Sequence, residues 1–169
     1  LIIENLVLIN FILPILLSFT CYNFLNKSYL GDGGAYLLSF IVGYILINFQ
    51  INQNVSPYYI VLFLWYPAFE NLFSILRRVL SKKLRPDKPD LLHLHHLIFR
   101  YINNNFNFNN KLKFSISGIV INIFNLIIFY IGSFFLYSTT KLLILIFFCI
   151  FVYLTSYFVL LKKLKFSND

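Results

Sequence analysis

All three histidines of the chain lie within four positions, in the segment PDLLHLHHLI: His93, His95 and His96. Imidazole titrates near neutral pH, so it can donate or accept a proton, or act as a charged donor, beside an anionic ligand. A zinc site needs three or four converging ligands, and no cysteine or well-placed second carboxylate lies nearby in the sequence. The cluster therefore indicates contacts to a phosphate or a nucleotide, with a purely structural role as the alternative.

The Pro–Asp breaks before the histidines predict the start of a helix. The helix is expected to begin near Asp90, with that aspartate as its N-cap. In such a helix His93 and His96 share one face at i and i+3, whereas His95 points elsewhere.

The turn YLGDGGAYLLSF carries a second group of residues suited to chemistry, with Gly31, Gly33 and Gly34 around the carboxylate of Asp32. Glycines allow backbone angles closed to other residues and let a ligand approach the chain closely. A carboxylate at a membrane surface is a hard oxygen ligand, suited to Mg²⁺ beside a diphosphate. The alternative is a connection between two helices in which Asp32 is the N-cap of the second.

The stretch YPAFENLFSILRR places an acid and two arginines at the end of an apolar run. Glu70 lies about 9 Å from the arginine end at ~1.5 Å per residue. A carboxylate there is costly unless it is paired or faces a polar cavity, so it is a functional candidate. Alternatively, it reaches the interface or pairs with a loop arginine. Arg77 and Arg78 can hold a phosphate through paired N–H bonds, or bind lipid headgroups and set orientation.

The segments between these residues are long and apolar. The chain is 59% apolar and 12% charged, whereas a soluble domain carries about a quarter charged residues. An all-α polytopic membrane helix bundle is therefore predicted, with the second span short and expected to extend at one end. Segments near the ~20 residues that cross a bilayer lie at 5–25, 35–50, 58–76, 114–136 and 142–161.

Basic residues are distributed unevenly along this predicted topology. All but one of the 14 Lys and Arg residues fall after the first span, in the loop 77–113 or after the last span, which alternating spans place on one side. Only Lys141 falls opposite. Because Lys and Arg concentrate in cytoplasmic loops, these three segments are predicted to be cytoplasmic, and the net charge of +8 indicates orientation rather than nucleic-acid binding. The asparagine-rich stretch NNNFNFNN in this loop is expected to be a solvated linker.

Taken together, the three quoted motifs resemble the C-terminal half of the polyprenyl-phosphate N-acetylhexosaminyl-1-phosphate transferases of the MraY/WecA type. The similarity runs from about Tyr22 to about Arg100 in order, spacing and predicted topology, and the later spans match only in being spans. It implies the C-terminal half of a ten-or-eleven-helix protein, and the lack of an initial methionine is expected of such a fragment. The alanine and tyrosine after the glycine turn, with the histidine motif, favour the WecA-like branch.

The resemblance implies transfer of a sugar-1-phosphate from a UDP-N-acetylamino sugar to a polyprenyl phosphate, with release of UMP. The reaction would take place at the cytoplasmic face of a bacterial inner membrane, in the synthesis of cell-envelope polysaccharides such as lipopolysaccharide O-antigen. Asp32 would bind the catalytic Mg²⁺, with Mn²⁺ as an alternative, and the three histidines would contact the nucleotide sugar or its phosphates. The paired arginines would hold the diphosphate or support the histidine loop. The predicted substrate-binding residues are Gly31, Gly33, Glu70, Arg77, Arg78 and Asp90.

The chain also departs from the family pattern. The family's paired aspartates belong to its N-terminal half, and this chain has no Asp–Asp pair, so it is expected to be inactive alone. Glu70 stands where many members carry aspartate. Two other functions are considered: a transporter with Glu70 as an intramembrane relay, and a scaffold whose basic loop binds anionic lipid. The apolar spans argue against transport, the scaffold predicts that replacing His93 changes nothing, and a homodimer is compatible with the transferase.

Overall fold

The computed structural model describes residues 2–25, 27–81, 92–106 and 109–166. Within these ranges it is helical, without strands, so the predicted all-α class is confirmed. In chain order the helices are α1 (Ile2–Phe24), α2 (Gly31–Gln53), α3 (Pro57–Ser81), α4 (Leu94–Asn105), α5 (Asn110–Ser133) and α6 (Thr139–Phe166).

Within the described ranges, four helices are long and apolar enough, by length and composition, to cross a membrane: Gly31–Gln53, Pro57–Leu80, Leu112–Ser133 and Thr139–Leu164. The protein is therefore a multi-pass membrane protein. The second predicted span extends at both of its ends rather than at one. The first predicted span falls on α1, of which Asn10–Phe24 is a shorter apolar helix.

The chain divides into two compact units, Leu1–Val55 and Ser56–Asp169. The first unit contains α1 and α2. After α1 the chain turns, and the backbone N–H of Lys27 donates to the carbonyl of Tyr22 at 2.9 Å. Beyond α2, Asn54 takes a left-handed conformation with φ 49°, a common way for a helix to end.

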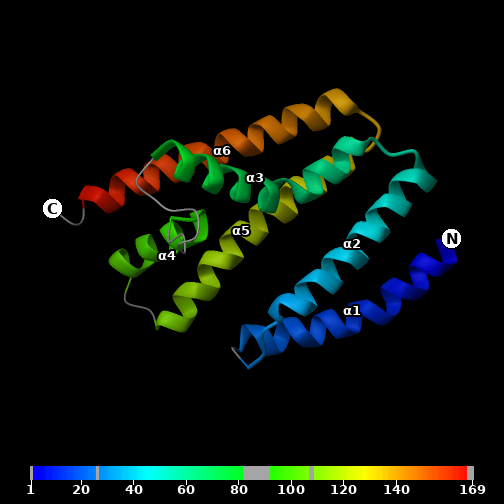
Figure 1. Cartoon of the computed structure of the whole chain (residues 1–169), viewed down its shortest axis with the longest axis horizontal. Helices are drawn as coiled ribbons and strands as arrows, with labels where there is room; N and C mark the ends of the chain where they lie inside the picture. Colours follow the sequence, from blue (N-terminus) through cyan, green and yellow to red (C-terminus); the bar gives the residue numbers. More distant parts are fainter. Residues whose placement is uncertain (1, 26, 82–91, 107–108, 167–169) are drawn as a thin grey trace. The chain divides into compact units, whose positions relative to one another are not determined.

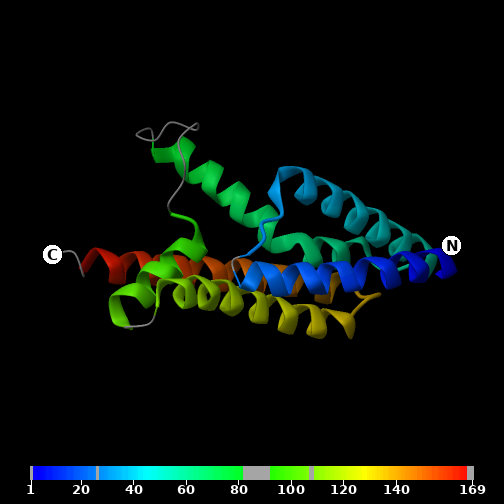
Figure 2. The ribbon, with the colours of Figure 1, turned by 90° about the horizontal axis from the view of Figure 1, so that it is seen from below.

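The second unit is a bundle of the long helices α3, α5 and α6, with the short helix α4 between α3 and α5 in the sequence. Helix α3 packs on α5 and α6, and α4 also packs on both of these helices. Figures 1 and 2 show α4 beside the first turns of α5 and the last turns of α6. The histidine segment therefore lies at the end of the bundle where α5 begins and α6 ends.

The centre of this bundle is aromatic. Phe73 of α3 makes edge-on contacts with Tyr153 and Tyr157 of α6, with ring centroids 5.6 and 4.9 Å away, and Phe69 lies 5.1 Å from Tyr153. On both helices the residues are four positions apart, so a single face of each supplies the contact. Each such pair contributes about 0.5–1.5 kcal/mol beyond the burial of its area.

The outward faces of the long helices are apolar as well. Large exposed side chains there include Leu72, Ile75, Ile123, Leu126, Phe147 and Phe151. A soluble monomer rarely exposes a contiguous surface of this kind, whereas lipid tails are as apolar as leucine. The outer surface therefore agrees with the membrane class.

The described residues of the predicted loop 77–113 are largely helical. Helix α3 continues to Ser81, α4 occupies Leu94–Asn105, and α5 begins at Asn110. The prediction that NNNFNFNN is a linker is therefore wrong at the two ends of this stretch, which belong to α4 and α5. The side-chain amide of Asn105 donates to the carbonyl of Tyr101 at 2.8 Å, within the last turn of α4.

Candidate functional site

Helix α4 begins at Leu94, so the predicted start near Asp90 is wrong, and Asp90 itself lies outside the described residues. His93 is the N-cap residue, with an extended backbone and no capping bond from its own side chain. The cap comes instead from α3, because the backbone N–H of Leu94 donates to Oε1 of Glu70 at 3.0 Å. An acceptor from another helix thus satisfies one of the N–H groups that every helix start leaves without a partner.

Glu70 is only 7% exposed, and its carboxylate is the centre of the polar contacts around α4. The same Oε1 lies 2.9 Å from Nδ1 of His93, and the phenol groups of Tyr66 and Tyr153 interact electrostatically with the carboxylate. A buried carboxylate is costly unless such partners surround it. Of the two alternatives left open by the sequence, pairing is therefore the one observed, although with a histidine. Contact with substrate stays a prediction.

Arg77 binds Leu92, the residue that precedes His93. Its Nη1 donates to the carbonyl of Leu92 at 2.9 Å and also to the hydroxyl of Tyr157 on α6. The guanidinium carbon lies 5.7 Å from the centroid of the Tyr157 ring. Support of the histidine segment, one of the two roles that the resemblance implies, is therefore compatible with the contacts of this arginine. A direct contact to diphosphate stays a prediction.

Arg78 makes different contacts from its neighbour. It donates from Nε to the carbonyl of Ser74 at 3.4 Å and from Nη2 to the Ser74 hydroxyl at 3.2 Å, both within α3. Consecutive residues of a helix point about 100° apart, so neighbouring arginines reach different partners. Phosphate binding by Arg78 stays a prediction.

The three imidazole rings lie together. Ring centroids are 5.6 Å apart for His93 and His95, 4.1 Å for His95 and His96, and 6.3 Å for His93 and His96. The prediction that His95 points elsewhere is therefore wrong. Its premise fails because His93 precedes the helix in an extended conformation, so the helical i, i+3 spacing does not apply to it.

The environment of His95 favours its neutral form. Burial lowers the pKa of this imidazole below its usual value of 6.5, and the neighbouring His96 and His93 lower it further, while Glu70 acts in the opposite direction. Near neutral pH His95 is therefore a neutral donor and acceptor. The cluster differs in this respect from a uniformly cationic surface.

Both ends of α4 are held by the long helices. Towards its C-terminal end, Phe99 stacks on Phe114 of α5 with centroids 4.0 Å apart, and Nζ of Lys113 donates to Oδ1 of Asn103 at 2.8 Å. Nζ of Lys163, on α6, lies 5.2 Å from the ring centroid of Tyr101. Basic residues of three helices thus gather at this end of the bundle, as their distribution in the sequence predicts. Which side of the membrane this end faces stays a prediction.

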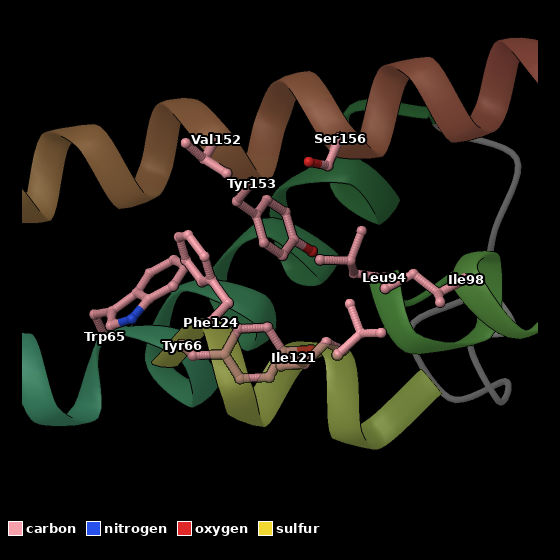
Figure 3. A pocket seen from close by; sticks show the side chains of 10 residues that line it. Trp65, Tyr66, Leu94, Ile98, Ile121, Phe124, Val152, Tyr153 and Ser156 are labelled. Atoms are coloured by element: carbon pink, nitrogen blue, oxygen red, sulfur yellow. The ribbon is translucent and has the colours of Figure 1, made fainter. Parts of the chain in front are cut away.

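A cavity of about 160 Å³ lies behind the first turn of α4, where α3, α4, α5 and α6 meet. Figure 3 shows Tyr153 between Val152 and Leu94, with Trp65, Tyr66 and Phe124 on the other side of the space. Its lining is almost wholly apolar, and it includes Tyr66 and Tyr153.

Sequence reasoning missed the contribution of α6. Tyr153 and Tyr157 are far from the histidines in the sequence, and nothing in the motifs points to them. The available clue is their spacing, because two tyrosines four positions apart in an otherwise apolar span put two hydroxyls on one helix face.

Asp32 belongs to the first unit and lies in the first turn of α2 with an exposed side chain. The alternative of an N-cap is not adopted, because the helix begins one residue earlier and Leu30 precedes it without a side-chain cap. Gly31 has φ +65°, which requires glycine at that position. Gly33 is helical, so the predicted special backbone is confirmed at one glycine of the turn only.

The surroundings of Asp32 fit an ion that is held jointly by the protein, water and substrate rather than one enclosed by protein ligands. Within the described ranges, no three His, Cys, Asp or Glu side chains are grouped as a metal site. Proteins hold Mg²⁺ through one or two carboxylates, completed by waters and substrate phosphates. A single exposed carboxylate at the start of a helix fits that mode of binding. Metal binding by Asp32, and its proximity to the histidines, stay predictions.

The described fold and site define a class: a multi-pass helical membrane protein with a buried polar network under a histidine cluster. Comparison with known proteins is more specific. Over 76 residues the chain is 36% identical to an undecaprenyl-phosphate alpha-N-acetylglucosaminyl 1-phosphate transferase of Yersinia pestis, a match that covers 44% of the chain. Enzymes of the same name from Escherichia coli K12 and Shigella flexneri match at 36% over 78 residues.

These matches confirm the resemblance to WecA-like transferases that the motifs predict. The chain spans about a fifth (20%) of the length of the curated relatives it matches. No protein-family model and no solved structure matches the chain.

Proposed function

We propose that the protein transfers a sugar-1-phosphate from a UDP-N-acetylamino sugar to a polyprenyl phosphate at the cytoplasmic face of a bacterial inner membrane. The names of the similar enzymes support N-acetylglucosamine as the sugar and undecaprenyl phosphate as the acceptor. The observation that carries the proposal is the histidine cluster, held by Glu70 and Arg77 at the basic end of a membrane bundle.

The chemistry is an exchange of one phosphoanhydride bond for another. An oxygen of the lipid phosphate forms a bond to the sugar-bearing phosphorus, the bond between that phosphorus and the bridging oxygen breaks, and UMP leaves with the electron pair. Such a transfer needs neutralisation of oxygen charge and alignment of the two phosphates more than covalent help from the protein.

The residues of this chain divide these tasks. Asp32 would hold Mg²⁺, which when bound supplies Lewis-acid polarisation of phosphate oxygens and a template for the two substrates. His95, kept neutral by its surroundings, can donate a hydrogen bond to a phosphate oxygen and thereby orient it. His93 and His96 are adjacent donors or acceptors in the same cluster.

The test uses membranes that contain the protein in its natural length, supplied with labelled UDP-N-acetylglucosamine and undecaprenyl phosphate. We expect Mg²⁺-dependent formation of a labelled lipid and release of UMP, with loss of both in Asp32→Asn and His95→Ala. Lys141→Ala is the matched control, because Lys141 is a cation at the other end of the bundle, 4.7 Å from the Phe135 ring centroid. Unchanged turnover in both site variants would refute the assigned roles, and no labelled lipid in the wild type would refute the function.

A further inference from the structure

One face of α3 forms hydrogen bonds to the peptide groups on both sides of His93. Arg77 binds the carbonyl of Leu92, and Glu70 binds the N–H of Leu94. Glu70 and Arg77 are seven residues apart, two turns of helix, so they project from the same side of α3. The single residue between the two fixed peptide groups is a histidine, and its ring nitrogen meets the same carboxylate oxygen.

We propose that Glu70 is a positioning residue for the histidine cluster. Its Oε1 fixes both the first turn of α4 and the tautomer of His93, and it acts through these groups rather than by touching substrate. The activity part of this inference rests on the proposed transferase function, whereas the tautomer does not.

The tautomer follows from what Oε1 already accepts. A carboxylate oxygen that accepts a backbone N–H at 3.0 Å has lone pairs for a second donor, and Nδ1 of His93 lies at 2.9 Å. When Nδ1 of His93 carries the hydrogen, it can donate this second hydrogen bond to Oε1 of Glu70. In a neutral imidazole the lone pair then resides on Nε2, so the second nitrogen is defined as the basic one.

Burial argues for positioning over substrate contact. The side chain of Glu70 is 9% exposed and that of His93 is 22% exposed, so the histidine is the more accessible member of the pair. Leu94, whose N–H completes the contact, is buried as well. An acceptor enclosed by these groups influences a surface reaction by setting where the histidines are and which nitrogen is basic.

Two substitutions at position 70 separate acceptor geometry from charge. Glu70→Gln keeps an oxygen at the same reach, which can accept from both Leu94 and His93, but it removes the negative charge. Glu70→Leu removes the acceptor at similar volume. A proton relay, a metal ligand or a charge contact to substrate would need the carboxylate itself, and Gln would then be as damaging as Leu.

In the transfer assay we expect Glu70→Leu to lose about 100-fold in kcat, as displacement of catalytic groups by about 1 Å does. Glu70→Gln should lose about tenfold or less, the difference between a charge-assisted and a neutral hydrogen bond. The loss from Glu70→Leu should also shrink in a His93→Ala background, because residues that act through one another are not additive. Equal losses in the Gln and Leu variants, or full additivity with His93→Ala, would overturn the proposal.

The second measurement reads the tautomer directly by NMR of ¹⁵N-histidine-labelled protein, with His93→Asn identifying the His93 signal. We expect a protonated Nδ1 in the wild type and in Glu70→Gln, and its loss in Glu70→Leu. A wild-type signal protonated at Nε2 alone, or no change in Glu70→Leu, would overturn the proposal. If no transferase activity is found in the wild type, the proposed function fails while this spectrum still decides the role of Glu70.

The matched control is Asn125→Leu, which breaks another buried polar contact of the bundle. Nε1 of Trp65 donates to Oδ1 of Asn125 at 3.0 Å. This variant should lower thermal stability, yet leave the His93 signal and the ratio of kcat to KM unchanged. A shift of the His93 signal in this control to the same extent as in Glu70→Leu would show a general loosening of the bundle and count against the proposal.

Discussion

The two carboxylates that the sequence singles out are held in opposite ways. Asp32 is exposed in the first turn of α2, after a glycine with φ +65°. Glu70 is enclosed by α3, α4 and α6 and is bonded to Leu94, with His93 at 2.9 Å. The difference teaches that the same functional group can serve different tasks: an exposed carboxylate is available to a ligand, and an enclosed one fixes the residues around it.

The largest expected effect is on activity at the exposed carboxylate. Asp32→Asn should lower the rate of lipid product formation by about 100-fold or more, because it removes the charge that would hold the divalent ion. Its effect on unfolding free energy should stay within about 0.5 kcal/mol, as for other exposed positions. The assay and a thermal melt of the same preparation check both parts, and a destabilised Asp32→Asn would remove the contrast with Glu70.

The enclosed carboxylate should affect stability as well as activity. Glu70→Leu is expected to lower the free energy of unfolding by about 1–3 kcal/mol, the cost of leaving the buried N–H of Leu94 without an acceptor. Denaturant or thermal unfolding in detergent measures this change. Stability equal to the wild type would mean that the contact to α4 contributes nothing.

The arginine pair offers a finer comparison. Arg77→Lys should cost about 1 kcal/mol of stability, because an ammonium cannot reproduce the guanidinium contacts to the Leu92 carbonyl and the Tyr157 hydroxyl. Arg78→Lys should stay within about 0.5 kcal/mol, since the described bonds of Arg78 are to Ser74 of its own helix. Equal effects in parallel melts would show that the two arginines are equivalent.

The smallest expected effect is a dependence of stability on pH through His95. Because its pKa is lowered in the folded protein, folding favours the neutral ring. That contribution is fully present above the unfolded pKa of about 6.5 and is lost as pH falls through the folded pKa. Melts across this range should show stability decreasing below about pH 6.5, and less steeply in His95→Gln. An identical slope in this variant would assign the effect to another group.

Local pattern predicts much of the fold. The long apolar runs predict the spans of α2, α3, α5 and α6, since length and apolar composition alone separate a membrane helix from a soluble one. The start of α4 is missed because the cap that sets it is Glu70, which is distant in the sequence. A search for a local N-cap therefore chooses Asp90, the nearest aspartate before the histidines.

The candidate site is predicted in kind but not in arrangement. The histidines, Glu70 and Arg77 are found from residue type and membrane position, because charged and titratable groups in apolar surroundings are rare and costly. The packing of α3, α4 and α6 decides the remaining contacts. It brings Arg77 and Glu70 to the peptide groups on the two sides of His93, and it brings the Tyr157 hydroxyl to Arg77. Spacing along one helix carries no information on such contacts.

The central proposal is that Asp32 binds a divalent ion that acts in the same reaction as the histidine cluster. Paramagnetic Mn²⁺ in place of Mg²⁺ tests this proposal most directly. In ¹⁵N-histidine-labelled protein with UMP bound, Mn²⁺ should broaden the signals of His93, His95 and His96 in the wild type. The broadening should disappear in Asp32→Asn. Signals that stay sharp in the wild type, or that broaden equally in Asp32→Asn, would contradict the account.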